Sequence, residues 1–372
     1  MNKSTYDIIK SSMPDSLRMK LDHIKRYLDA GKAAVFVGAG FSKNARMPDH
    51  AEMKDWNALG LDFYRKLYGE PEAGSLMFQN PINLATQVEA SFGRHELDSL
   101  IEQSLPDDVI VHSPLHVSLL NLGWHDVFTT NYDTLLERAC LDADKPYTVV
   151  YNKDTLLYST SPRIVKLHGS FPNIHPYIIT EEDYRTYPQC FPEFVNTVRQ
   201  SLIENLFCMI GFSGDDPNFK SWLGWLRDVM GTKISPVYFV TYDSNLHDSR
   251  RNLLAKQKIE VLNLHDLPDV GGLQQAFEFF FQYLQTENQS QWNLNLKKGL
   301  REIKTVEQLK DVTNEMAAIR SSYPGWLILP EKYYDDCRDV VSEIHFCGKI
   351  REMDGLEKAD LYRFYYELCW RL

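Results

Sequence analysis

The sequence predicts an α/β protein: a Rossmann-like parallel sheet with helices on both faces, a helical insertion after the first strand and a C-terminal helical extension. Three observations support this prediction. An apolar run at 33–37 leads directly into a glycine-rich turn. Between residues 125 and 285, short apolar runs alternate with segments of helical periodicity, the pattern of strand–helix–strand units with right-handed crossovers. A polar linker at 286–295 then precedes a last segment with helical patterning.

The first strand, at 33–37, follows a helix expected at 16–30, where apolar residues recur at helical spacing. Residues 49–105 show helical patterning, including an amphipathic stretch at 84–105, and contain no convincing strand, so an insertion is expected at about 50–110. Further strands are expected at 125–130, 163–167, 177–180, 206–210, 236–241 and 259–264. Helices are expected at 133–140, 181–187, 193–204, 218–230, 245–257 and 273–284.

The last part of the chain is expected to be a separate helical region at 296–372, following a main domain at 15–285. Helical patterns occur at 306–319 and 335–346, and an apolar run at 326–329 stops at a proline. The final residues, 365–372, are still apolar and periodic. Either this helix closes a small appended domain or the sequence stops within a larger regulatory domain, and we favour the second interpretation.

Composition limits the function classes. The chain has 372 residues, 44% of them hydrophobic, and a formal net charge of −11, so direct nucleic-acid binding is not expected. It has neither an apolar run long enough to span a membrane nor an N-terminal signal core, which favours a cytoplasmic protein without a membrane association. Its six cysteines form no Cys-x-x-Cys pair, which argues against structural zinc and against a disulfide scaffold.

The glycine-rich turn reads Gly-Ala-Gly-Phe-Ser at 38–42. Glycines without side chains let backbone amides approach a phosphate closely, although an ordinary tight turn has the same appearance. The third glycine of a Gly-x-Gly-x-x-Gly dinucleotide fingerprint is missing, because Lys43 stands in its place. A Walker-type phosphate loop is absent as well, so neither an ordinary dehydrogenase nor a P-loop NTPase is expected.

Four further polar turns follow predicted strands and are expected at the same edge of the sheet, where ligands bind in such folds. In Thr129-Thr-Asn-Tyr-Asp133, a helix cap is the preferred single interpretation, and Asn131 orienting a ribose hydroxyl or a water is the alternative. His168, before Gly169, is either a core histidine or a general base. The turn at 211–216 and Asn263 have turn or cap interpretations beside ligand ones.

Taken together and in order, these motifs resemble the SIR2 (sirtuin-like) family. The family pattern Gly-Ala-Gly-x-Ser-x-x-x-Gly-Ile-Pro-Asp-Phe-Arg lies without gaps on 38–51, and its Thr-Gln-Asn-x-Asp and His-Gly motifs resemble 129–133 and 168–169. The resemblance covers about 15–285. It implies an NAD+-binding Rossmann-like domain, with Asn131 and His168 as catalytic residues. The NAD+-contacting residues it implies are Gly38, Ala39, Gly40, Phe41, Ser42, Asp49, Thr130, Asp133, Gly211, Ser213, Asp216 and Asn263.

The departures from the family pattern are also informative. The zinc-binding Cys-x-x-Cys pair of the protein deacetylases is missing, Arg46 replaces a glycine, and His50-Ala51 replaces Phe-Arg. The chain therefore resembles the bacterial SIR2-like effectors of anti-phage defence, whose members hydrolyse NAD+, and no zinc is expected. NAD+ would be the substrate, and such a toxic activity implies control by homo-oligomerisation, by a regulatory partner or by a fused C-terminal sensor domain. The alternatives are an NAD-dependent protein deacylase or ADP-ribosyltransferase, and a non-catalytic sensor of NAD+ or ADP-ribose.

Overall fold

The computed structural model describes residues 1–48, 53–71, 80–212, 216–231, 236–285, 303–321, 328–329 and 350–371. Internal contacts divide the chain into two compact units. One unit comprises Met1–Ile24 and Gly31–Gln285, and the other comprises Lys25–Ala30 and Thr286–Leu372. In the part of the chain that the structure describes, no helix is both long and apolar enough to cross a membrane.

A seven-stranded, fully parallel sheet forms the centre of the first unit, with strand order β3-β4-β2-β1-β5-β6-β7. The strands are β1 (Ala33–Val37), β2 (Asp126–Thr129), β3 (Thr148–Val150), β4 (Arg163–Lys166), β5 (Leu206–Ile210), β6 (Val237–Thr241) and β7 (Ile259–Asn263). β1 and β5 are buried at every position, as expected of central strands covered on both faces. The predicted Rossmann-like α/β class is therefore confirmed.

Two strand predictions were wrong. The edge strand β3 was not predicted, because Thr148–Val150 is a run of only three residues and is half-exposed at two of them. The stretch at 177–180 was predicted as a strand, and it is apolar and buried, but it pairs with no strand. Its amides bond elsewhere: Ile178 donates to the His168 carbonyl, while Ile179 and Thr180 donate to the carboxylate of Asp183.

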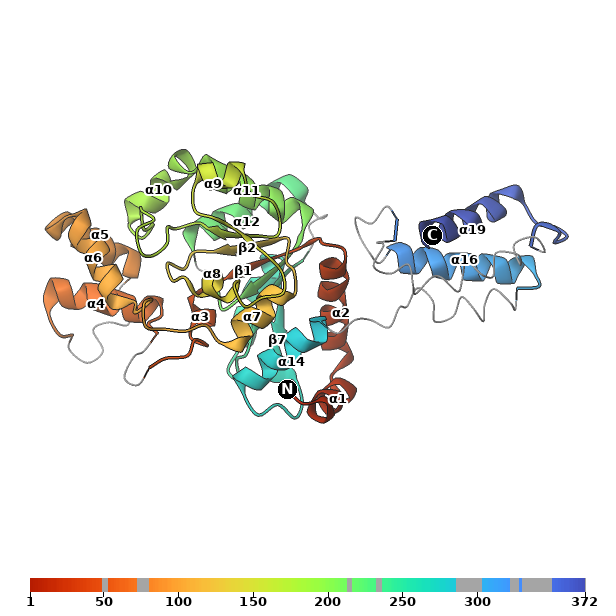
Figure 1. The fold of residues 1–372 in the computed structure, drawn as a ribbon, viewed down its shortest axis with the longest axis horizontal. Coiled ribbons are helices and arrows are strands. Elements are labelled where there is room, and N and C mark those ends of the chain that lie inside the picture. Colours follow the sequence, from red (N-terminus) through yellow and green to blue (C-terminus); the bar gives the residue numbers. More distant parts are fainter. Residues whose placement is uncertain are drawn as a thin grey trace. The chain divides into compact units, whose positions relative to one another are not determined.

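Helices cover the sheet on both sides, as Figure 1 shows, with α11 and α12 on one face and α7 and α14 on the other. The helices of this unit outside the insertion are α1 (Lys3–Ser12), α2 (Asp15–Asp29, whose last residues, 25–29, belong to the second unit), α3 (Ala39–Ser42), α7 (Pro114–Asn121), α8 (Leu135–Ala139), α9 (Lys153–Leu157), α10 (Glu181–Cys190), α11 (Pro192–Glu204), α12 (Pro217–Met230), α13 (Asp248–Lys256), the 3-10 turn η1 (Leu264–Asp266) and α14 (Leu273–Gln285). The crossovers predicted from the alternating sequence pattern are therefore present.

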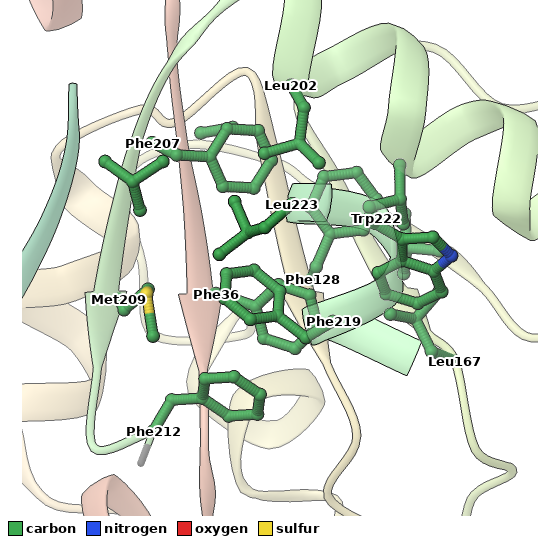
Figure 2. Packing of buried hydrophobic residues seen from close by; sticks show 14 of the residues in the cluster. Phe36, Phe128, Leu167, Leu202, Phe207, Met209, Phe212, Phe219, Trp222 and Leu223 are labelled. Atoms are coloured by element: carbon green, nitrogen blue, oxygen red, sulfur yellow. The ribbon is translucent and has the colours of Figure 1, made fainter. Parts of the chain in front are cut away.

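The main core lies between the central strands and the helices α11 and α12. Figure 2 shows Phe36, Phe128 and Phe207 of three adjacent strands packed with Phe219 and Trp222 of α12. The Phe36 ring lies 5.1 Å from the Phe219 ring in an edge-on arrangement, which aromatic pairs prefer. Because these side chains are almost fully buried, the core fixes the strands whose ends carry the polar turns.

The predicted helical insertion consists of α4 (Trp56–Tyr68), α5 (Pro81–Phe92) and α6 (Arg94–Ser104). The stretch at 84–105 forms two helices rather than one, because Gly93 between them has a φ of +86° that ends α5. Arg94 then ties the insertion to the first unit's sheet domain: its guanidinium bonds both carboxylate oxygens of Asp183 at 3.0 Å and also the Tyr177 carbonyl.

The second unit contains a pair of helices, α16 (Val306–Ser321) and α19 (Lys358–Arg371). An apolar cluster that includes Leu309, Met316 and Phe364 joins them. Arg320 of α16 also forms a double hydrogen bond with the Glu367 carboxylate of α19. The helix predicted at 335–346 lies outside the described residues, as do the first two residues of the apolar run at 326–329.

Candidate functional site

Four of the polar turns meet at one edge of the sheet because the strands before them end in register. Val37, the last residue of β1, pairs with Thr129 of β2 on one side and with Ile210 of β5 on the other. Thr129 in turn pairs with Lys166, the last residue of β4. The turns that begin at residues 38, 130, 167 and 211 are therefore neighbours at the carboxyl ends of the strands, where doubly wound sheets bind ligands.

The glycine-rich turn packs directly on the turn after β5. The Gly38 amide donates to the Ile210 carbonyl at 3.0 Å, and the Gly40 amide donates to the Gly211 carbonyl at 2.9 Å. A Cβ atom on Gly38 would lie 2.5 Å from the Gly211 carbonyl oxygen, and one on Gly40 would lie 2.8 Å from it. The glycines are therefore required for this close approach. Since the Phe41 amide also bonds internally, to the Gly38 carbonyl, three of the turn's amides have protein partners, which leaves their predicted contact with a phosphate without support.

Ser42 joins the glycine-rich turn to the turn after β2. Its hydroxyl donates to the Asp133 carboxylate at 2.8 Å and accepts from the Asn131 side-chain amide at 2.9 Å. The Asn131 backbone amide is held as well, by the Thr129 hydroxyl at 3.1 Å. Ser42 and Asp133 are buried, whereas Asn131 and the neighbouring Thr130 are partly exposed at the rim. The structure thus orients the Asn131 amide toward one hydroxyl while leaving the residue accessible.

Burial also shifts the pKa of the carboxyl group in this cluster. Asp133 is 5% exposed, and this desolvation raises its pKa above the ordinary aspartate value, while the nearby Lys166 ammonium and the Ser42 hydrogen bond oppose the shift. The other carboxylate oxygen accepts from the Leu135 amide at 3.2 Å, at the start of α8. Asp133 therefore binds an amide at the start of α8 from the position before the N-cap residue, Thr134, and the Asn131 side chain is left with the Ser42 contact.

His168 lies at the end of β4 and is 2% exposed. Its Nε2 atom is 3.4 Å from the Asn218 side-chain amide nitrogen and 4.0 Å from the Asp216 carboxylate. Burial lowers the pKa of His168 below the ordinary histidine value, although Asp216 and Asp183 act in the opposite direction. A neutral imidazole at neutral pH is the form that can accept a proton, so the environment suits a general base.

Two residues beside His168 were not predicted. The Tyr184 hydroxyl donates to Asp216 at 3.1 Å, and its ring lies 5.5 Å from the imidazole, edge-on. Asn218 approaches the imidazole from α12. Neither carries a signal in the sequence, because Tyr184 lies within an amphipathic helix and Asn218 follows a proline at a helix start. Gly169 has a φ of +88°, and a Cβ there would lie 2.6 Å from the Ile174 carbonyl oxygen. The backbone therefore requires glycine at the second position of the His-Gly pair.

A cavity of about 240 Å³ opens beside the glycine-rich turn. Gly40, Gly211 and Asn44 contribute to its wall, and the rest is largely aromatic or apolar. The remaining lining residues are Phe41, Phe212, Phe239, Val240, Thr241, Tyr242, Leu273 and Phe277. The cavity therefore lies at the ends of β1, β5 and β6, with flat apolar walls and a few polar groups, as small-molecule sites usually have.

The other predicted site residues divide into three groups. Asp216 caps α12 through the Phe219 amide at 2.9 Å, which agrees with its cap interpretation and leaves its second oxygen toward His168. Asn263 holds the loop after β6, because its side chain accepts from the Asp243 amide and donates to the Asp243 carbonyl. Its contact with a ligand stays a prediction. Asp49 and Ser213 lie outside the described residues. Within the described part of the chain, no group of three His, Cys, Asp or Glu side chains could hold a metal ion.

Comparison with known proteins finds a family match within the first unit. Residues 125–262 match the family described as the SIR2-like domain. This segment of the chain is therefore similar to SIR2-like domains. The matched segment holds Asn131, His168 and the turn at 211–216, so the resemblance inferred from the motifs is confirmed. The glycine-rich turn at 38–42 lies outside the matched segment, nearer the N-terminus.

Several curated relatives resemble the chain at modest identity. A defense-associated sirtuin 2 of Bacillus subtilis is 26% identical over 220 residues, which are 57% of this chain and 21% of that protein. An NAD(+) hydrolase ThsA of Enterococcus faecium is 25% identical over 312 residues, 81% of this chain and 58% of that protein. A protein of the same name from Acinetobacter baumannii is 28% identical over 216 residues, 56% of this chain and 42% of that protein. The chain thus spans between about a fifth and three fifths of the lengths of these relatives, and its SIR2-like domain resembles members named for defence and for NAD+ hydrolysis.

Proposed function

We propose that the protein is an NAD+ glycohydrolase, which converts NAD+ and water to ADP-ribose and nicotinamide, and that it acts as the effector of a bacterial anti-phage abortive-infection system. The observation that carries the proposal is the placement of Asn131 and His168 in turns that follow neighbouring strands, β2 and β4, at the same edge of the sheet where a cavity opens at the ends of β1, β5 and β6. The relatives named as NAD(+) hydrolases support the same reaction.

In this reaction the bond between C1′ of the ribose and the nicotinamide nitrogen breaks, and its electron pair neutralises the charged ring. The ribose carbon becomes oxocarbenium-like, a water oxygen bonds to it, and the water's proton leaves. We assign the orientation of the ribose and the water to the Asn131 amide, which Ser42 holds at 2.9 Å. His168 accepts the proton, from the water or from a ribose hydroxyl, and a positioned base of this kind contributes about 10²–10⁴-fold.

The rest of the substrate fits the same edge of the sheet. The aromatic wall formed by Phe41, Phe239 and Phe277 suits a flat purine base, so we assign the adenosine end to the 240 Å³ cavity. The pyrophosphate would then lie near the turn at 38–42, contacting groups other than the amides of Gly38, Gly40 and Phe41, which have protein partners. Asp133 acts by fixing Ser42 and with it Asn131, since its carboxylate is already occupied by protein donors.

An NAD+-depleting enzyme must be silent in a healthy cell. We propose that homo-oligomerisation, or a regulatory partner or sensor domain acting through residues 296–372, controls the SIR2-like domain. This part of the proposal rests on the resemblance to defence effectors alone. Activity measured across a range of protein concentrations would test it, because an oligomer-dependent enzyme loses specific activity on dilution whereas an independent monomer does not.

The test of the reaction is nicotinamide release from NAD+ by the purified protein, beside His168→Ala and Asn131→Ala. We expect release by the wild-type protein without any peptide acceptor, and a loss of at least about 10²-fold in each variant. Release that requires an acylated or acceptor peptide would indicate a protein deacylase or an ADP-ribosyltransferase. Tight binding of NAD+ without turnover would indicate a sensor.

A further inference from the structure

A buried lysine lies behind the candidate site. Lys166 is the last residue of β4, two positions before His168, and is only 1% exposed. Its ammonium lies 3.0 Å from the Glu137 carboxylate on α8 and donates to the Asp133 carbonyl at 2.5 Å. A lysine this deeply buried is uncommon unless its charge is matched by a partner, so the position calls for an explanation.

The lysine belongs to a continuous chain of contacts that ends at Asn131. From Glu137 the chain runs through the Lys166 ammonium to the Asp133 backbone. It continues from the Asp133 carboxylate through the Ser42 hydroxyl to the Asn131 side-chain amide, over bonds of 2.8 and 2.9 Å. These bonds connect different segments of the polypeptide. A change at Lys166 would therefore be transmitted through them to Asn131 at the rim of the site.

The acidic groups in this network outnumber the basic ones. The carboxyl groups of Asp133 and Glu137 lie around one ammonium, and the second Glu137 oxygen, Oε2, is buried with no hydrogen-bond partner among the described residues. An unsatisfied buried oxygen costs free energy, so the ion pair is not explained by stability alone. Negative charge behind Asn131 would favour a ribose that becomes cationic in the transition state of the proposed reaction.

We infer that Lys166 is a positioning residue for the candidate site: held by Glu137, its ammonium fixes the Asp133 turn and so aims the Asn131 amide through Ser42. This inference rests on the proposed NAD+ hydrolysis for its kinetic test. It has a structural consequence that is independent of any reaction, namely that the environment of the Asn131 side-chain amide depends on Lys166.

The kinetic experiment compares three full-length variants. Lys166→Met should lower kcat for nicotinamide release by about 10²-fold, the effect typical of a small misplacement, with a much smaller change in KM. Lys166→Met/Glu137→Gln removes the uncompensated carboxylate, so it should regain much of the melting temperature while kcat stays low. Arg163→Met is the matched control, because Arg163 forms a buried ion pair with Asp126, at 2.7 Å, at the opposite end of β4. It should lower the melting temperature and leave kcat within about twofold.

The structural experiment uses protein labelled with ¹⁵N-asparagine. The Asn131 side-chain amide signal is identified by its absence in Asn131→Asp. It should shift in Lys166→Met and in the double variant, and stay in place in Arg163→Met. If the double variant regains kcat, or if its Asn131 signal matches that of the wild-type protein, Lys166 serves only as the counter-charge of Glu137 and the inference is overturned. Absence of hydrolysis by the wild-type protein would defeat the proposed function, while the amide signal would still decide the role of Lys166.

Discussion

The Ser42 hydroxyl and the Asp133 carboxylate are joined by a buried 2.8 Å hydrogen bond, although 91 positions separate the two residues in the chain. Since the same hydroxyl accepts from Asn131, one oxygen atom links the glycine-rich turn after β1 to the polar turn after β2. The two turns therefore act as one unit. The geometry of this unit depends on Ser42, which the sequence alone shows only as part of the glycine-rich turn.

Replacement of Ser42 by alanine should separate these turns. The change removes both hydrogen bonds and leaves a buried carboxylate oxygen without its donor, which costs about 1.5–3 kcal/mol of unfolding free energy. Nicotinamide release should fall by about 10–10²-fold, because Asn131 is no longer aimed. Ser201→Ala is the matched control: Ser201 donates to the buried Asp126 carboxylate at 2.9 Å, far from the site along the sheet. It should cost similar stability in urea unfolding and leave the rate unchanged, and equal rate losses in both variants would refute the assignment.

Gly211→Ala should be far more harmful than an ordinary glycine substitution. Gly211 has a φ of +62°, and a Cβ there would lie 2.1 Å from the Phe41 amide nitrogen. Gly231, with a φ of +57° and nothing within 4 Å, isolates the cost of the backbone conformation. Urea unfolding should show a loss of about 1 kcal/mol for Gly231→Ala and several times that for Gly211→Ala, because only the latter must also move the glycine-rich turn. Equal losses of unfolding free energy in the two variants would mean that the glycine-rich turn moves aside for the new Cβ at no cost.

The strands predicted correctly from the sequence, such as β1 and β5, are both hydrogen-bonded in the sheet and buried. β1 and β5 are continuous apolar runs because helices cover both of their faces. The run at 177–180 has the same composition, but the Asp183 carboxylate at the start of α10 takes its amides, and this competition is a tertiary property that no local pattern records. The short edge strand β3 was missed for the opposite reason. It pairs in the sheet, but its half-exposed positions give little apolar signal in the sequence.

The site was predictable to the extent that it consists of strand ends. Asn131 and His168 could be proposed because they stand in turns directly after strands and match the motifs of a known family, and parallel strands in register bring such turns together. Lys166 and Tyr184 were not found, because one lies inside a strand and the other inside a helix, where charged and aromatic residues have ordinary structural uses. Their significance comes from contacts with Asp133 and Asp216, which depend on how the chain returns to the same edge.

His116 should make stability depend on pH. It is 1% exposed on α7, its Nε2 has no hydrogen-bond partner in the part of the chain that the structure describes, and burial lowers its pKa from 6.5 to about 4. Between these pH values the unfolded chain binds the proton and the folded protein does not, so stability is lost as the pH falls below about 6.5. The shift corresponds to a ceiling of roughly 3 kcal/mol, about 2 of which should be lost by pH 5. Urea unfolding of His116→Leu should show that much less change between pH 8 and pH 5, and parallel curves for the two proteins would contradict this account.

Arg94 should hold the helical insertion in place. Its guanidinium, 29% exposed, bonds the Asp183 carboxylate and the Tyr177 carbonyl, which connects α6 to the segment after His168. Arg94→Met should cost about 1–3 kcal/mol, a value reduced for the partial exposure of the pair, and should speed hydrogen exchange in α6. Arg185, on the surface of α10 and paired with Glu182, is the control, and Arg185→Met should change neither quantity measurably. Unchanged exchange in Arg94→Met would mean that apolar packing alone fixes the insertion.

Asp216 should set the pH at which His168 gains its proton. Its carboxylate lies 4.0 Å from Nε2 and raises the pKa of a histidine that burial lowers below its ordinary value, so the acid limb of kcat/KM should lie below about pH 6.5. Asp216→Asn removes the charge but keeps a good helix cap, so it should move this limb to lower pH with little loss of stability. Asp216→Ala should move the limb in the same direction and also cost about 1 kcal/mol, because the Phe219 amide loses its acceptor. Glu182→Gln, which removes an exposed carboxylate of α10, should leave the limb in place. A limb that stays fixed in Asp216→Asn would show that His168 does not carry the proton that limits the rate.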